Sequence, residues 1–264
     1  MYIKNNSIDG GNAFDWGRTS EDYAKYRDVY PEEVYQKVLS YGLCTEGQRV
    51  LDLGTGTGVL PRNMYKHGAR FIGTDISENQ IGWARRLSAQ DGMDIEYIVS
   101  SAEELDFPEN SFDCVTAFTC FFYFDHERLM PRLVKMLKDG GHILIAYLSW
   151  LPYEDRIAAE SEKLILRYNP KWTGAGFTRR EVGIPKCYGE AFEVVRSEYF
   201  DVQIPFTIDS WNGRIKACRG VGASLSEEDI AAFEKEHIEM LRSNTSGEFT
   251  ILHTVAMADL RVKK

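Results

Sequence analysis

The chain has 264 residues, of which 44% are hydrophobic and 27% charged, so it has enough apolar material for a large core. This composition excludes a disordered chain, and the length favours one α/β domain with an added segment. The formal net charge of −9 gives no electrostatic support for phosphate binding, so we expect no nucleic-acid partner.

Five widely scattered cysteines favour reduced thiols over a disulfide framework or a metal site, because no two of them have C-x-x-C spacing. The first residues, MYIKNNSIDGGN, contain no apolar signal region, and no run approaches the roughly 18 consecutive apolar residues of a membrane span. We therefore expect a cytoplasmic protein with no membrane partner and no bound metal. The sequence leaves the oligomeric state open.

The sequence predicts alternating helices and strands over the first 150 residues. The spacing of apolar residues predicts helices over 31–43, from the glycine turn to about 67, and over 77–88 and 127–138. Strands are predicted over 49–53, 70–74, 95–99, 112–118 and 143–148. Ser77 is placed to cap the third helix, and Asp139-Gly140-Gly141 to end the last one. This alternation predicts a parallel sheet with helices on both faces.

The alternation breaks after Trp150. A helix is predicted over 153–168, and the loop NPKWTGAGF that follows it is interpreted as part of an inserted cap. Further on we predict a strand over 192–205, a helix capped by Ser226, and a last strand over 249–260. His237 falls on the apolar face of that helix, where a packed core histidine is expected.

The segment RVLDLGTGTGVL, residues 49–60, carries the most specific functional signal. Asp52 begins a D-x-G-x-G-x-G pattern, whose glycines allow a tight turn and close approach of a ligand. Ligands of open parallel sheets bind outside the carboxyl ends of the strands, where a helix N-terminus favours negative charge. Asp75 ends the second strand and is suited to accept hydrogen bonds from a ribose diol. An adenosine-containing ligand fits both features.

A dinucleotide site is an alternative for this turn. It requires G-x-G-x-x-G, with the third glycine one position later than Gly58, and it has no role for Asp52. The chain departs from that pattern on both counts.

In order and spacing, positions 20 to 150 resemble the small-molecule branch of class I S-adenosylmethionine-dependent methyltransferases. The resemblance rests on VLDLGTGTG, GTDIS, SSAEELDFPENSFD and LKDGGHILIA. It implies a Rossmann-like, seven-stranded, mostly parallel sheet of order 3-2-1-4-5-7-6, with the last strand antiparallel. It also implies four segments of a single domain: a helical lid (1–45), a cofactor-binding core (46–150), an inserted cap (151–190) and a part that completes the sheet (191–264).

The resemblance also implies which residues bind S-adenosyl-L-methionine. The loop from Gly54 to Gly58 would lie against the methionine part, Asp75 would bind both ribose hydroxyls, and Ile76 would pack on adenine. The implied cofactor-binding set on this side is Asp52, Gly54, Thr55, Gly56, Gly58, Asp75, Ile76, Ser101, Ala102, Glu103 and Phe118. Ser101 stands where relatives often have Asp or Asn, which weakens a side-chain contact to adenine but leaves a backbone contact.

An N-terminal helix, EDYAKYRDVYP, also resembles a helix of this branch that folds over the cofactor. Tyr23 and Arg27 lie four residues apart and therefore share one helical face. We predict that they reach the methionine carboxylate or the substrate, since arginine suits a bidentate carboxylate contact. The alternative is a surface arginine beside a packed tyrosine.

The aromatic run from Phe118 to His126, FTCFFYFDH, follows the fourth strand and forms either a wall of the site or the end of the core. Phe122 stands where relatives often have His, so no general base is possible there. The candidates for a catalytic base are Tyr123 and His126, whereas His142 is expected to be structural.

The sequence thus predicts an S-adenosylmethionine-dependent methyltransferase that moves a methyl group to a small-molecule acceptor by in-line displacement. Two alternatives remain: a non-catalytic cofactor-binding protein of the same fold, and a nicotinamide-dependent oxidoreductase. The acceptor and its reacting atom are not indicated.

Overall fold

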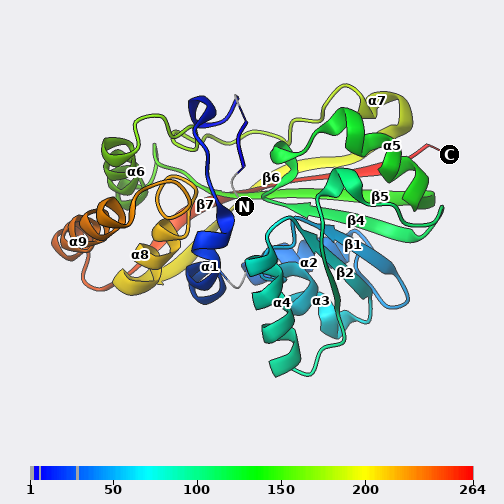
Figure 1. Cartoon of the computed structure of the whole chain (residues 1–264), viewed down its shortest axis with the longest axis horizontal. Helices are drawn as coiled ribbons and strands as arrows, with labels where there is room; N and C mark the ends of the chain where they lie inside the picture. Colours follow the sequence, from blue (N-terminus) through cyan, green and yellow to red (C-terminus); the bar gives the residue numbers. More distant parts are fainter. Residues whose placement is uncertain (1–2, 6, 28–29, 264) are drawn as a thin grey trace. The chain divides into compact units, whose positions relative to one another are not determined.

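The computed structural model describes residues 3–5, 7–27 and 30–263. Within them, seven strands form one sheet of order β3-β2-β1-β4-β5-β7-β6 (Figure 1). The strands are β1 (Arg49–Leu53), β2 (Arg70–Asp75), β3 (Glu96–Val99), β4 (Phe112–Phe118), β5 (Leu137–Trp150), β6 (Phe192–Thr207) and β7 (Glu248–Val262). The pairs among β1 to β5 are parallel, and the sheet becomes antiparallel at its end. The predicted fold class and strand order are confirmed.

The chain divides into two compact units. The core unit contains Val29–Leu148, Arg180–Phe200 and Val255–Lys264, and the cap unit contains Met1–Asp28, Ser149–Arg179 and Asp201–Thr254. The boundaries of the four predicted segments remain a prediction.

The helices of the core unit follow the strands in the predicted order. They are α2 (Glu32–Ser40), α3 (Val59–Met64), α4 (Glu78–Gln90), α5 (His126–Met136) and α7 (Tyr188–Ala191). Short 3₁₀ helices occur at Tyr65–His67, Ala102–Glu104 and Phe121–Tyr123. Ser77 caps α4 as predicted, since its hydroxyl accepts the Gln80 N–H at 3.4 Å. Leu51, Val115 and Ile143, one from each central strand, are fully buried in the core between these helices and the sheet.

The helix predicted over 127–138 ends two residues early, at Met136. Leu137 instead begins β5 and pairs with Phe112, and the next pair joins Cys114 to His142. The predicted turn at Asp139–Gly141 is thus an irregularity inside β5, where Gly140 has a φ of +71°. Leu137 has the spacing of a helix residue, but in the folded chain it pairs with β4 instead. Burial in the sheet stabilises this pairing, and the local sequence does not record it.

The cap unit contains α1 (Ser20–Tyr26), α6 (Arg156–Tyr168), α8 (Ile208–Lys216) and α9 (Glu227–Asn244), with 3₁₀ helices at Asp9–Gly11 and Trp16–Thr19. Ser226 caps α9 as predicted, because its hydroxyl accepts the Asp229 N–H at 3.1 Å. The helix predicted from residue 153 begins only at Arg156, since Asp155 supplies its cap. Helix α8 was not predicted. No helix in the described part of the chain has the length and hydropathy that a membrane span requires.

Candidate active site

The glycine turn joins β1 to α3 in the core unit. Gly54, Gly56 and Gly58 have φ values of +59°, +57° and +78°, a region that other residues rarely adopt. A Cβ on Gly54 would lie 2.8 Å from the Cβ of Cys120, and one on Gly58 would lie 2.4 Å from the hydroxyl oxygen of Tyr97. The fold itself therefore requires glycine at both ends of the turn.

Asp75 lies directly beside this turn. Its Oδ2 accepts the N–H of Gly56 at 3.0 Å, and its Oδ1 accepts the N–H of Ser77 at 2.8 Å. Burial raises the pKa of Asp75, while the hydrogen bonds from Ser77, Gly56 and Ile76 act in the opposite direction. The structure therefore brings the glycine turn and the acid at the end of β2 together, as a nucleoside site requires.

Asp52 is a buried acid inside β1. Its Oδ1 accepts a 2.6 Å hydrogen bond from the Thr116 hydroxyl, and Thr116 is its direct partner in the pairing of β1 with β4. Burial raises the pKa of Asp52 to about 7, although the hydrogen bond from Thr116 partly offsets this and the charge of Asp75 adds to it. Near neutral pH Asp52 therefore exists in both protonation states.

The raised pKa of Asp52 predicts a pH-dependent stability. Between the ordinary value of 3.8 and about 7, the unfolded chain gives up this proton while the folded protein keeps it. The contribution of Asp52 is thus complete below pH 3.8 and is lost as the pH rises through about 7. Urea unfolding at pH 5 and pH 8 measures this, and Asp52→Asn, which stays neutral, should lose less stability over that interval. Equal losses in both proteins would show that Asp52 is ionised throughout.

The loop after β3 also lies beside Asp75, whose carbonyl accepts the N–H of Ser100 at 3.0 Å. Ser101 precedes the short helix Ala102–Glu104 and makes no side-chain cap, and Ala102 is buried. The Glu103 carboxylate accepts the N–H of Asp125 at 2.8 Å and so holds the start of α5. Ile76 lies half-buried directly after β2. These positions cluster at one edge of the sheet, and their contacts with adenine remain a prediction.

Tyr23 and Arg27 belong to the cap unit. Helix α1 ends at Tyr26, earlier than the predicted segment, so Arg27 is its C-cap residue. The Arg27 guanidinium lies over the Tyr23 ring, 4.1 Å from its centroid, and donates to the Ala217 carbonyl at 3.4 Å. The two side chains are therefore neighbours on one surface, and their contact with a cofactor remains a prediction.

The aromatic run after β4 divides into buried and exposed members. Phe118 and Phe121 are buried in the core, whereas 46% of the Phe122 surface is exposed and Tyr123 is half-buried beside it. The ring nitrogen Nδ1 of His126 lies 3.2 Å from the Tyr188 hydroxyl, and burial lowers the pKa of His126. The core interpretation therefore holds for Phe118 and Phe121, whereas a wall of the site formed by the exposed members remains a prediction.

Two residues of the site escaped the sequence analysis. Thr116 hydrogen-bonds to Asp52, and Cys120 both contacts Gly54 and donates its thiol hydrogen to the Leu53 carbonyl at 3.0 Å. The sequence did hold a signal for Thr116, because it is a polar residue within the apolar stretch CVTAF. Its partner, however, depends on the register between β1 and β4, which the sequence does not give.

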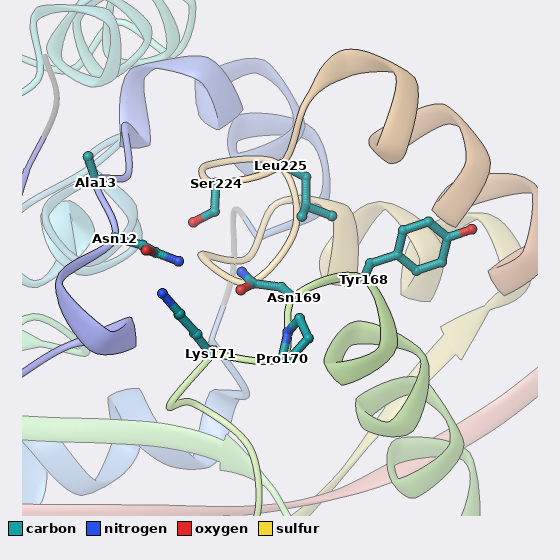
Figure 2. Close-up of a pocket in the computed structure, with 8 residues that line it drawn as sticks. All are labelled: Asn12, Ala13, Tyr168, Asn169, Pro170, Lys171, Ser224 and Leu225. Atoms are coloured by element: carbon teal, nitrogen blue, oxygen red, sulfur yellow. The ribbon is translucent and has the colours of Figure 1, made fainter.

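The cap unit holds two features that resemble functional sites. A cavity of about 500 Å³ is lined by Asn12, Ala13, Tyr168, Asn169, Pro170, Lys171, Ser224 and Leu225, and in Figure 2 the Asn12 and Lys171 side chains point toward each other. None of these residues belongs to the predicted site. The two ring nitrogens of His237 lie 2.9 Å from the Ser161 hydroxyl oxygen and 2.9 Å from the Asn212 side-chain oxygen, so the three side chains form a hydrogen-bonded row. Ser161 and His237 are, however, fully buried. Burial lowers the pKa of His237 to about 4, so it is a neutral core histidine, as predicted.

Residues 51–145, which include the glycine turn, Asp75 and the loop after β3, match a family model described as a methyltransferase domain. Over these residues the chain is therefore similar to methyltransferase domains. A ubiquinone biosynthesis O-methyltransferase of Rhizobium etli is 33% identical over 129 residues, covering 48% of this chain and 52% of the relative. A demethylmenaquinone methyltransferase of Thermus thermophilus is 33% identical over 101 residues, covering 37% and 46%. The chain thus spans about half the length of these curated relatives.

Solved structures share the fold over most of this chain. The YcgJ protein of Bacillus subtilis aligns with a TM-score of 0.53 at 17% identity, covering 89% of this chain and all of that one. A structure described as a putative sarcosine dimethylglycine methyltransferase from Galdieria sulphuraria aligns with a TM-score of 0.53 at 19% identity, covering 88% and 84%. At these identities the likeness establishes the fold.

Proposed function

We propose that the protein is an S-adenosyl-L-methionine-dependent methyltransferase that acts on a small-molecule acceptor. The observation that carries this proposal is the hydrogen bond between Asp75 and the Gly56 N–H, which joins the glycine turn to the acid at the end of β2. A nucleoside with a charged substituent needs both groups at one edge of a parallel sheet.

The residues of the turn fit such a cofactor. The hydroxyl oxygen Oγ1 of Thr57 is buried and has no hydrogen-bond partner among the described residues. An unpaired buried hydroxyl is costly, and a bound ligand would supply the missing partner. Gly56 also has a positive φ and, as a glycine, no Cβ, so a ligand can approach the turn closely at this position.

In this proposal Asp75 holds the ribose hydroxyls, and the residues from Asp52 to Gly58 lie along the methionine part. Ile76, Ser101, Ala102 and Glu103 surround the adenine, while Phe118 borders the site. Tyr23 and Arg27 hold the methionine carboxylate or the substrate. The supporting observations are the clustering of the core-unit residues and the stacking of Arg27 on Tyr23.

The cofactor supplies a methyl group activated by its bond to a positively charged sulfur. Once bound, it would supply this methyl group to a lone pair of the acceptor, and the leaving group would be a neutral thioether. The protein must hold the acceptor in line at about 3 to 3.5 Å and exclude water. A protonated acceptor would also need a base, and burial keeps the pKa of His126 low enough for a neutral imidazole to serve. Tyr123 is the other candidate.

The curated relatives support a small-molecule acceptor, because one is named for ubiquinone biosynthesis and the other for demethylmenaquinone. The cysteine pattern also supports a cytoplasmic location, and the net charge of −9 supports the absence of a nucleic-acid partner.

Calorimetry with S-adenosylmethionine, S-adenosylhomocysteine and NAD tests the proposal directly. We expect micromolar binding of both sulfur compounds and none of NAD. Incubation of a metabolite extract with cofactor labelled in the methyl group should then transfer the label to a small molecule. Binding of NAD alone would indicate the oxidoreductase, and cofactor binding without any transfer would indicate the non-catalytic protein.

A further inference from the structure

An exposed aromatic cluster follows β4 and β5 in the core unit. Phe122 lies with its ring centroid 4.1 Å from that of Tyr123 and 5.8 Å from that of Tyr147. Phe122 is 46% exposed, and the two tyrosines are half-buried. The neighbouring Phe121 and Phe124 pack on the core instead, so the run presents only part of its aromatic surface outward.

This aromatic cluster lies close to the glycine turn. Cys120, two residues before Phe122, donates to the Leu53 carbonyl at 3.0 Å and leaves no space for a Cβ on Gly54. Phe118 pairs with Ala146, so the aromatic run and Tyr147 follow paired positions of β4 and β5. The exposed rings therefore lie at the edge of the sheet where the glycine turn also lies.

The Tyr147 hydroxyl adds a polar group to this surface. Burial raises its pKa, so the hydroxyl stays protonated at neutral pH. A protonated phenol can donate a hydrogen bond, which suits contact with an oxygen of a bound molecule.

We propose that Phe122, Tyr123 and Tyr147 form the surface on which the methyl acceptor binds, and that the acceptor is a planar aromatic hydroxy compound. Its ring stacks on Phe122, and Tyr147 donates a hydrogen bond to one of its oxygens. Such a surface selects flat rings, because offset and edge-to-face contacts between aromatic groups add to simple area burial. This assignment rests on the proposed methyltransferase function, since it places the acceptor beside the cofactor-binding turn.

The first test compares ring types by ligand-observed NMR titration of the full chain saturated with S-adenosylhomocysteine. The probes are catechol and 4-hydroxybenzoate, each paired with its saturated analogue, cyclohexane-1,2-diol and 4-hydroxycyclohexanecarboxylate. We expect the aromatic probes to bind about tenfold more tightly than the saturated ones. Equal affinities within each pair would overturn the proposal.

Variants then locate the contact. Phe122→Ala should weaken catechol binding by about 3- to 10-fold, whereas Tyr199→Ala should leave it unchanged. Tyr199 is the matched control because it is 47% exposed, close to the 46% of Phe122, and lies on β6. Tyr147→Phe should weaken catechol binding by about 3- to 10-fold and leave toluene, which has no oxygen to accept a hydrogen bond, unaffected.

The affinity for S-adenosylhomocysteine separates the two proposals. If it binds normally to every variant and Phe122→Ala does not change catechol binding, the acceptor surface is wrong and the methyltransferase proposal stands. If S-adenosylhomocysteine does not bind the unmodified protein, both proposals fail.

Discussion

Replacement of Asp75 by alanine is expected to reduce the affinity for S-adenosylhomocysteine by about 100-fold or more. Hydrogen bonds to a charged group contribute about 1.5 to 3 kcal/mol each, and a ribose diol would make two of them. The substitution also removes the acceptor of the Gly56 N–H, so the glycine turn loses a fixed partner. Isothermal titration calorimetry measures the change.

A matched control keeps this result interpretable. Asp91→Ala removes an exposed carboxylate at the end of α4, far along the helix from Asp75, and should leave the affinity unchanged. Thermal unfolding of both variants shows whether they are folded at the temperature of the titration. A folded Asp75→Ala protein that binds within threefold of the unmodified protein would contradict the ribose assignment.

Replacement of Trp211 by alanine is expected to destabilise the cap unit by about 3 to 5 kcal/mol. Trp211 is fully buried and lies against Trp150 and Phe206, with ring centroids 5.5 Å and 4.8 Å away. Its indole N–H also donates to the Ser161 hydroxyl at 2.9 Å. The substitution therefore opens a cavity and takes a donor from a buried polar group.

Urea unfolding followed by circular dichroism measures the loss. Trp83→Ala is the control, because Trp83 is a half-buried residue of α4 that stacks with Arg86 at 4.4 Å. Its loss should be much smaller, since the site is open to water. Equal destabilisation by the two substitutions would show that Trp211 does not organise the core of the cap unit. The affinity for S-adenosylhomocysteine reports separately on the core unit.

The sequence predicted the elements whose signals are local. The strand 112–118 has the predicted bounds, and Ser77 and Ser226 cap the helices they were expected to cap. The strand was predicted from its apolar run, and the two helix starts were predicted from the cap residue next to each helix. Helix α8 escaped prediction because its sequence, IDSWNGRIK, contains Asn and Gly, which have low helix propensity. Burial of Trp211 and Ile215 stabilises it.

In the candidate site, too, local sequence signals predicted some features and tertiary contacts decided others. The alternating glycines and the acid after the second strand were sufficient to predict an adenosine-containing ligand, and the family resemblance added a methyl donor. The chemistry of Asp52, however, depends on its burial and on the Thr116 hydroxyl brought to it from a strand 64 residues away. A pKa is set by the surroundings of the group, which no local pattern records.

The sequence by itself determined the α/β class and the glycine turn, and it predicted the ligand type, because periodicity, cap residues and glycine patterns are short-range properties. Only the tertiary structure decided that Asp75 bonds to Gly56, and that Phe122 is exposed while Phe121 is buried. Adjacent residues of one aromatic run differ in exposure because the packing of β4, β5 and the following short helix selects which ring faces the core. That selection is a long-range effect, and it distinguishes a candidate acceptor surface from the interior.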